Sequence, residues 1–227
     1  MPLWLYILTG ITGCTALVAL RLYYILPIFT HNKPRSIIRR KGKGARLPAK
    51  KILCVVLGSG GHTAEMTRLL QGVDFDRYNQ RLYIVGDTDH LSMDQIGGTL
   101  EGSRDPLTED YIVCRVPRSR AVGQSWWSSV LTAVHCFVCV CRHMYLNTPD
   151  VVLCNGPGNC VVVGVVAWVP RVLGIKRIPV VYIESFARVR SLSLSGKIMY
   201  LLADRFIVQW PGLVQNYPRA EYIPNLV

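Results

Sequence analysis

The feature that most constrains this chain is an uncharged apolar run at its amino end. No charged residue occurs over residues 3–20, and accepting Arg21 extends the apolar stretch to residue 29. A helix of that length is long enough to cross the roughly 30 Å hydrocarbon core of a bilayer. The sequence therefore predicts a transmembrane anchor over residues 1–29.

The positive charge of the chain is concentrated beside that run. Ten of the 26 Lys and Arg residues lie within residues 1–51, whereas none of the 14 Asp and Glu residues does. Because positively charged flanks stay in the cytosol, the basic linker over residues 30–50 predicts a cytosolic domain over residues 51–227. A cleaved signal peptide is the alternative, but its basic residues would precede the apolar run. A nucleic-acid binder would carry its charge on the folded domain, so that class is not favoured.

Short apolar runs alternate with helix-sized intervals throughout this domain. Such continuous runs are typical of a parallel sheet that is covered on both faces. The fold class predicted is α/β, a Rossmann-like open parallel sheet preceded by one transmembrane helix. The expected strands are residues 52–57, 81–86, 111–115, 151–155, 180–184 and 205–210, and the expected helices are 63–70, 125–145, 159–173 and 192–203.

One of these helical segments is unusually apolar. Residues 161–175 are too short for a second clean span, and Pro170 and Arg171 interrupt them. Two readings stay open, a helix buried against the sheet and a helix lying at the bilayer surface.

Two groups of residues have the chemistry of metal ligands. The first lies on one apolar helix, whereas structural zinc usually draws its ligands from two elements; it comprises His135, Cys136, Cys139, Cys141 and His143. The second is Asp87-Thr88-Asp89, which matches the letters of the aspartate pair that holds a metal in some sugar-nucleotide enzymes. Most of the eight cysteines lie in apolar runs, where cysteine packs as a small hydrophobe. We expect neither a metal nor a disulfide framework.

A glycine-rich loop, Gly58-Ser59-Gly60-Gly61-His62-Thr63, follows the first expected strand and opens the first helix. Glycine permits positive φ and close approach of the backbone to a ligand, and the free amides of a helix start favour phosphate. Thr63 stands where a dinucleotide fingerprint has its third glycine, and the Lys of a P-loop is missing. His62 adds a titratable group to an expected anion site.

A second loop of the same kind, Asn155-Gly156-Pro157-Gly158-Asn159, follows the fourth expected strand. Doubly wound sheets bind ligands at the carboxyl ends of strands near the switch in strand order. We therefore expect both loops to face one crevice, although a tight turn without a ligand would use the same residues.

The fifth expected strand ends in Glu184-Ser185-Phe186-Ala187-Arg188. Arg188 is suited to clamp a phosphate, and Glu184 to orient a sugar hydroxyl or to act as a base. An ordinary surface ion pair is the competing interpretation.

Taken together, these segments resemble a known family, the membrane subunit of the dolichol-linked N-acetylglucosamine transferase. The resemblance covers nearly the whole chain and includes Gly212 as one departure, where the family pattern has an acidic residue. It rests on residues 58–63 with Glu65 and Met66, Thr88 with Asp89, 155–158 with Cys160, 184–188, and Val208-Gln209-Trp210-Pro211.

The resemblance implies one half of a two-chain glycosyltransferase of the two-Rossmann-domain (GT-B) type. This chain would supply the anchor and the acceptor half, and a separate soluble catalytic subunit would hold the UDP-N-acetylglucosamine donor. The acceptor would be N-acetylglucosaminyl diphosphodolichol on the cytosolic face of the endoplasmic reticulum membrane, and no tightly bound cofactor is expected. In agreement, the sequence after Trp210, from 211 to 227, is too short for a second Rossmann domain, so none is expected here.

The transfer needs a general base for the attacking sugar hydroxyl, and His62 is the first candidate, with Glu184 as the second. The expected partner-binding residues at the carboxyl end are Tyr222, Ile223, Leu226 and Val227. The expected substrate-binding residues are Gly58, Ser59, Gly60, Gly61, Thr63, Glu65, Asn155, Gly156, Gly158, Ser185 and Arg188.

Two other classes of function remain possible. A membrane-tethered NAD(P)-dependent oxidoreductase would use the same first loop, but its acidic residue should lie about 20 residues further on. Asp87 lies well beyond that distance from Gly58, which fits poorly. A non-catalytic membrane recruiter would keep the anchor and would not need His62, Glu184 or Arg188.

Overall fold

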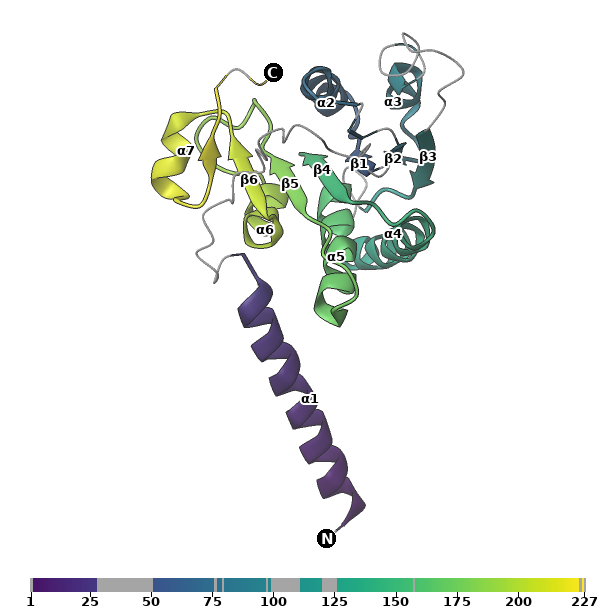
Figure 1. The fold of residues 1–227 in the computed structure, drawn as a ribbon, viewed down its shortest axis with the longest axis vertical. Helices are drawn as coiled ribbons and strands as arrows, with labels where there is room; N and C mark the ends of the chain where they lie inside the picture. The colour runs from purple at the N-terminus through teal and green to yellow at the C-terminus, as the bar shows by residue number, and fades with distance from the viewer. Residues whose placement is uncertain are drawn as a thin grey trace, which may run out of the picture.

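The computed structural model describes residues 2–27, 51–75, 77–78, 80–96, 98, 111–119, 126–156, 158–224 and 226. A long amino-terminal helix stands apart from a domain in which helices and parallel strands alternate (Figure 1). The helices are α1 (Leu3–Ile25), α2 (Gly61–Gln71), α3 (His90–Gln95), α4 (Trp126–Leu146), α5 (Gly158–Leu173), α6 (Leu194–Leu202) and α7 (Pro211–Asn216). The strands are β1 (Ile52–Val56), β2 (Gln80–Gly86), β3 (Tyr111–Val116), β4 (Val151–Asn155), β5 (Val180–Ile183), β6 (Arg205–Val208) and β7 (Glu221–Tyr222).

The described strands form one seven-stranded sheet in the order β3-β2-β1-β4-β5-β6-β7, and every pairing is parallel. The chain adds strands in one direction from β1 to β3 and then returns to place β4 on the other side of β1. The order of the strands therefore reverses between β1 and β4. In sheets of this kind the reversal opens a crevice at the carboxyl ends of the two central strands.

Alternate residues of each strand enter two separate cores, because successive side chains point to opposite faces of a sheet. Cys54 and Val56 of β1 pack with α4, α5, α6 and α7. Leu53 and Val55 pack with Met66 of α2. This alternation explains why the strands are apolar along their whole length, as the sequence predicted for a sheet covered on both faces.

α1 projects from the side of the domain on which α4, α5 and α6 lie (Figure 1). Its 22-residue span from Trp4 to Ile25 is long and apolar enough to cross a membrane, and none of its 18-residue apolar window is buried inside the protein. The predicted anchor thus has the length and exposure that a membrane span requires. Residues 28–50, which include the end of the predicted anchor and the basic linker, lie outside the described residues.

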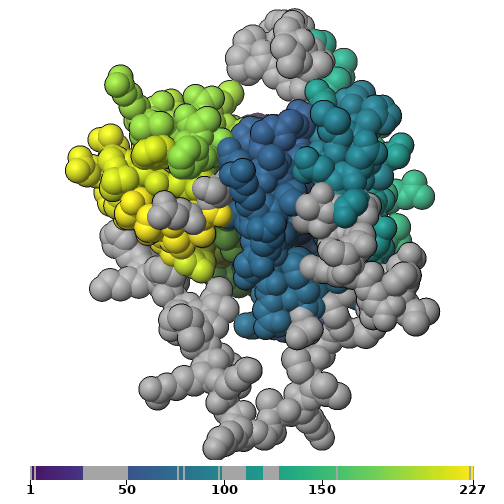
Figure 2. All heavy atoms as spheres, turned by 90° about the horizontal axis from the view of Figure 1, so that it is seen from above, coloured from purple at the N-terminus to yellow at the C-terminus, as the bar shows by residue number. Residues whose placement is uncertain are grey.

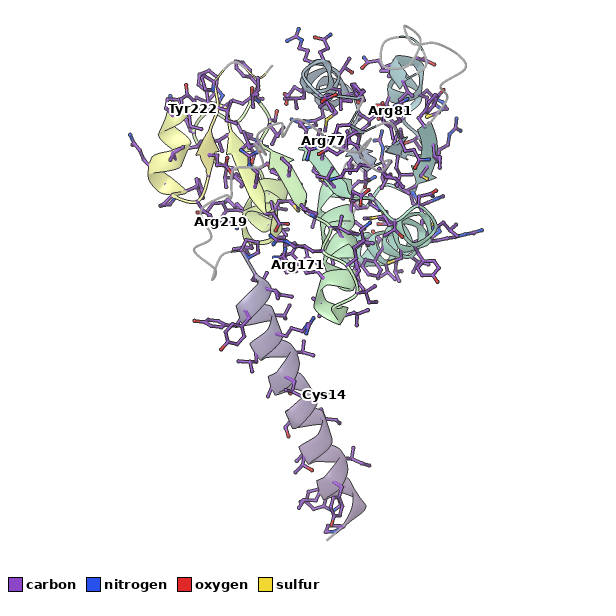
Figure 3. The ribbon with its side chains drawn as sticks, in the orientation of Figure 1. Cys14, Arg77, Arg81, Arg171, Arg219 and Tyr222 are labelled. Atoms are coloured by element: carbon purple, nitrogen blue, oxygen red, sulfur yellow. The ribbon has the colours of Figure 1, made fainter. Side chains whose placement is uncertain are left out.

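The end of α1 is joined to α5 by Arg171 (Figure 3). The guanidinium donates to the carbonyl of Ile25 over 2.8 Å and to Asp204 over 2.9 Å, and it lies 4.1 Å from the ring centre of Trp168. Arg171, which interrupts the apolar run in the sequence, therefore connects the anchor to the domain.

The apolar segment 161–175 forms most of α5, and the structure settles part of its open interpretation. Val163, Val166 and Ala167 are buried in the core, as predicted for a helix packed against the sheet. Val169, Leu173 and Ile175 remain exposed. α4 is the second helix long and apolar enough for a span, but 22% of that window is buried, and Cys136, Val140 and Met144 lie in the core.

Three short elements were not predicted from the sequence. α3 and α7 have six residues each and β7 has two. Elements of this length show too few turns or alternations for a periodic pattern. The polar loop expected over residues 97–110 lies, apart from residue 98, outside the described residues.

Candidate functional site

The two glycine loops meet at the reversal in strand order. The first loop follows β1 and the second follows β4, and these strands are hydrogen-bonded neighbours. Gly60 has φ 63° and Gly156 has φ 77°, backbone conformations that favour glycine. Seen from the side away from α1, the blue segment that includes α2 lies between the carboxyl-terminal part of the chain and the β2–β3 part (Figure 2). The predicted meeting of the loops is thus present in the structure.

His62 reaches across from the first loop to the second. Its Nδ1 lies 3.1 Å from Oδ1 of Asn155, which is 1% exposed. The imidazole also lies so close to Gly156 that an added β-carbon there would overlap its Cε1 atom. Gly156 is therefore required both for its positive φ and to leave room for the His62 ring.

Glu65 joins the same contact from α2. Oε2 of Glu65 accepts a hydrogen bond from Nδ2 of Asn155 over 2.9 Å. Oε1 accepts a second bond from Oγ of Ser185 over 2.8 Å, and the backbone amide of Phe186 lies 3.4 Å from Oε2. This half-buried carboxylate thus binds the last residue of β4 and residues that follow β5, although the sequence predicted that it binds substrate.

Three loops therefore meet at one cluster, which we call the Glu65 cluster and define as His62, Glu65, Asn155 and Ser185. All four were predicted as site residues, and the structure brings them into direct contact. What the sequence did not indicate is that they bond to one another.

Ser92 of α3 contacts the first loop at Gly58 and Thr63. Its hydroxyl oxygen lies 2.7 Å from Oδ2 of Asp89 and 3.0 Å from the carbonyl oxygen of Gly58, two acceptors for its single proton, and it contacts the hydroxyl of Thr63. Asp89 also accepts from the amide of Ser92 and so caps α3. Thr63 is 1% exposed, and its contact with substrate stays a prediction. Ser92 was missed because it is distant from Thr63 in the sequence and lies on a helix that the pattern does not show.

In the first loop Ser59, Gly60 and Gly61 are exposed to solvent, whereas Gly58 is buried. A β-carbon added at Gly60 or Gly61 meets nothing within 4 Å. The backbone of these residues is therefore open to an approaching group, as expected for anion binding at the start of a helix.

Glu184 has a different environment from the one predicted. Its carboxylate is 1% exposed and accepts from the amide of Ser185 over 3.2 Å and from the amide and hydroxyl of Ser193 over 3.2 and 3.0 Å. Gly196 packs against it, since an added β-carbon would overlap Oε2. The structure thus encloses this carboxylate in the turn that leads into α6, and its catalytic role stays a prediction.

Burial raises the pKa of Glu184 above its ordinary value. The bonds from Ser193 and Ser185 and the charge of Arg188 act in the opposite direction. The loss of hydration is therefore the larger effect, which is expected for a carboxylate enclosed by protein.

Residues after β5 and β6 complete the edge of the site. Nε1 of Trp210 donates to the carbonyl of Phe186 over 2.7 Å, and the two rings lie 5.0 Å apart. Gln209 donates to the carbonyl of Glu184 over 3.3 Å. The Val-Gln-Trp-Pro motif thus supports the loop after β5. Arg188 in that loop is exposed, so its guanidinium is accessible to a ligand.

The carboxyl end is partly built into the sheet. Glu221 and Tyr222 form β7 beside β6, Arg205 pairs with Glu221, and the amide of Ile223 donates to Val208 over 3.1 Å. Tyr222 remains 43% exposed at the sheet edge (Figure 3). Leu226 is half-buried, and Val227 lies outside the described residues.

The candidate metal ligands do not gather in the described part of the chain, where no group of three or more His, Cys, Asp or Glu side chains has the arrangement of a metal site. Cys136 is buried in the core and Asp89 caps α3. All eight cysteines are free.

The sequence matches a known family over most of its length. The profile of the family described as "Oligosaccharide biosynthesis protein Alg14 like" matches residues 53–226. The chain belongs to this family. Alg14-like relatives named UDP-N-acetylglucosamine transferase subunit ALG14 include those of Homo sapiens, 44% identical over 179 residues, and Yarrowia lipolytica, 36% identical over 221 residues. The human alignment covers 77% of this chain and 82% of the human protein. The Yarrowia alignment covers 97% of this chain and 98% of the Yarrowia protein.

Solved structures with a similar fold are longer than this chain. Acinetobacter baumannii MurG superposes with a TM-score of 0.53 at 13% identity, and a UDP-N-acetylglucosamine 2-epimerase with 0.53 at 14%. The matches cover 78% and 77% of this chain but only 44% and 48% of those proteins. The Alg14-like fold thus corresponds to somewhat less than half of a GT-B-type chain, as the sequence predicted.

Proposed function

We propose that this chain is the membrane-anchored acceptor subunit of a two-chain N-acetylglucosaminyltransferase. The observation that carries the proposal is its 44% identity to a human protein named as a UDP-N-acetylglucosamine transferase subunit. The reaction moves N-acetylglucosamine from UDP onto N-acetylglucosaminyl diphosphodolichol. The family favours this reaction over the oxidoreductase alternative.

The geometry supports an acceptor site at the reversal in strand order. The exposed amides of Ser59 to Gly61 and the guanidinium of Arg188 suit the diphosphate of the acceptor, because backbone amides at a helix start and guanidinium groups both favour phosphate. His62 takes the proton of the attacking hydroxyl. The donor, UDP-N-acetylglucosamine, is held by a soluble partner subunit.

The anchor places this site at the membrane that contains the acceptor. The exposed α1 supports a single span, and the basic residues after it support a domain in the cytosol, at the endoplasmic reticulum. The partner docks at the carboxyl end, where Tyr222 is exposed; Ile223, Leu226 and Val227 follow it in the sequence. An exposed aromatic residue at a sheet edge is a common anchor of protein interfaces.

A transferase assay on membranes that contain the full chain tests the proposal. Transfer from UDP-N-acetylglucosamine to a diphosphodolichol-linked acceptor is expected only when the soluble subunit is added. Tight binding of UDP-N-acetylglucosamine by this chain alone would contradict a split enzyme, and a lack of transfer with both subunits present would contradict the reaction itself.

A further inference from the structure

The orientation of the Asn155 amide is set by Glu65. A carboxylate can only accept hydrogen bonds, so the NH₂ end of Asn155 must face it, as the 2.9 Å contact from Nδ2 to Oε2 shows. With the amide turned the other way, its carbonyl oxygen would face the carboxylate without a proton between them. Oδ1 of Asn155 is therefore turned toward His62, 3.1 Å from Nδ1.

Glu65 is itself held in place. Oγ of Ser185 and the amide of Phe186 bind the same carboxylate, so the loop after β5 fixes its position. Asn155 is 1% exposed, which leaves its amide little contact with water. A buried polar group keeps its hydrogen-bond partners because an unsatisfied one is costly.

A fixed acceptor opposite Nδ1 determines where the proton of His62 resides. Neutral imidazole has one N–H, and only an Nδ1–H can donate to Oδ1 of Asn155. Nε2 then carries the free lone pair. We propose that Glu65 is a positioning residue that, through Asn155, fixes the tautomer of His62 and makes Nε2 the proton-accepting atom.

The inference rests on the proposed function, in which His62 is the base, and it specifies how that base works. As the acceptor oxygen bonds to the anomeric carbon, its proton passes to Nε2, and the bond from that carbon to the phosphate oxygen breaks with its electron pair leaving on UDP. His62 becomes an imidazolium that still donates from Nδ1 to Asn155. Catalytic triads have a similar arrangement, in which a third group orients the base.

The tautomer is measurable without turnover. The full chain is labelled with ¹³C,¹⁵N-histidine in detergent, and the His62 signal among the five histidines is identified by its loss in His62→Ala. The expected signature of neutral His62 is a protonated Nδ1 and an unprotonated Nε2. A protonated Nε2 in the wild type would overturn the inference.

The variant Glu65→Gln tests whether Glu65 orients the amide of Asn155 or only holds the loops together. Glutamine retains the size and can still bond to Asn155 and Ser185, but its amide can face Asn155 with either end, so Asn155 is free to turn and both tautomers of His62 become populated. Ser185→Ala is the matched control, because it removes one bond to Glu65 but leaves the bond from the amide of Phe186 and the carboxylate oxygen that faces Asn155; the wild-type tautomer is expected. An unchanged tautomer in Glu65→Gln would overturn the inference.

With the partner subunit present, Glu65→Gln is expected to lower kcat by about 10- to 100-fold, with little change in the KM of the acceptor, by comparison with orienting residues elsewhere. If His62→Ala retains turnover, the proposed base is wrong even when the tautomer is as expected. If His62→Ala is inactive and Glu65→Gln keeps the wild-type tautomer, only the positioning role is wrong.

Discussion

Two carboxylates beside the crevice, Glu65 and Glu184, take part in opposite kinds of network. Glu65 binds residues that lie 90 and 120 positions away and joins three loops. Glu184 binds residues within nine positions of itself and closes one turn. The difference indicates that long-range bonds assemble the site, whereas the local ones stabilise a single loop. Activity and stability should therefore depend on different carboxylate clusters.

The largest effect is expected from His62→Ala in the Glu65 cluster. Loss of a general base typically lowers the rate by about 10² to 10⁴. The half-buried imidazole lies against Gly156, and its removal takes one hydrogen-bond partner from the buried Asn155, so we expect the free energy of unfolding to fall by roughly 1 to 3 kcal/mol while the domain stays folded. Turnover is measured with saturating donor and acceptor in the presence of the partner subunit, and recruitment of the partner to membranes serves as the control. Turnover close to wild type would remove His62 from the mechanism.

A smaller effect, on stability, is expected from Glu184→Ala. The amides of Ser185 and Ser193 would lose their acceptor in a buried turn, which costs roughly 1 to 3 kcal/mol. The measurement is thermal or urea denaturation of the full chain in detergent.

Gly196→Ala tests the same turn from the other side and is also expected to destabilise the domain. An added β-carbon would overlap Oε2 of Glu184. Gly212→Ala is the matched control, since it also lies near a helix start but its β-carbon would meet nothing within 4 Å. Equal stabilities of the two alanine variants would contradict the enclosed position assigned to Glu184.

The smallest effect expected is a dependence of stability on pH. Because burial raises the pKa of Glu184, the folded protein binds this proton more tightly than the unfolded chain does. The free energy of unfolding of the wild type, relative to Glu184→Gln, should therefore rise as pH falls toward the ordinary value of 4.5, and this advantage is lost as pH rises through the folded value. Parallel denaturation curves of the two proteins from pH 7 downward measure the difference; a trend of opposite sign would place the carboxylate in a charged, well-compensated setting.

Much of the fold was predictable because it follows from local pattern. The six expected strands agree with β1 to β6 to within two residues at each end, since an apolar β-branched run between helix-sized intervals has few other interpretations. β7 was missed because two residues carry no pattern, and the carboxyl end was interpreted as a docking segment only.

The four residues of the Glu65 cluster were each named from the sequence, but the hydrogen bonds among them were not predicted. Glycine loops after strands indicate where a ligand binds, and His62 and Asn155 were found on that basis. The partners of Glu65 were not found, because they lie on other loops and only the order of the strands brings them together. The bonds of Glu184 to Ser185 and Ser193 were not predicted, since sequence alone does not show whether a carboxylate at a strand end faces the crevice or the following turn.

The contact between Arg171 and Ile25 makes α5 a spacer of defined length. This helix begins at Gly158, beside the crevice, and Arg171 near its other end holds the last turn of the anchor. Its 16 residues correspond to ~24 Å at 1.5 Å per residue. The distance from the crevice to the end of α1 is thus set by the length of α5, a helix whose Cys160, Val163 and Ala167 are fixed in the core of the domain.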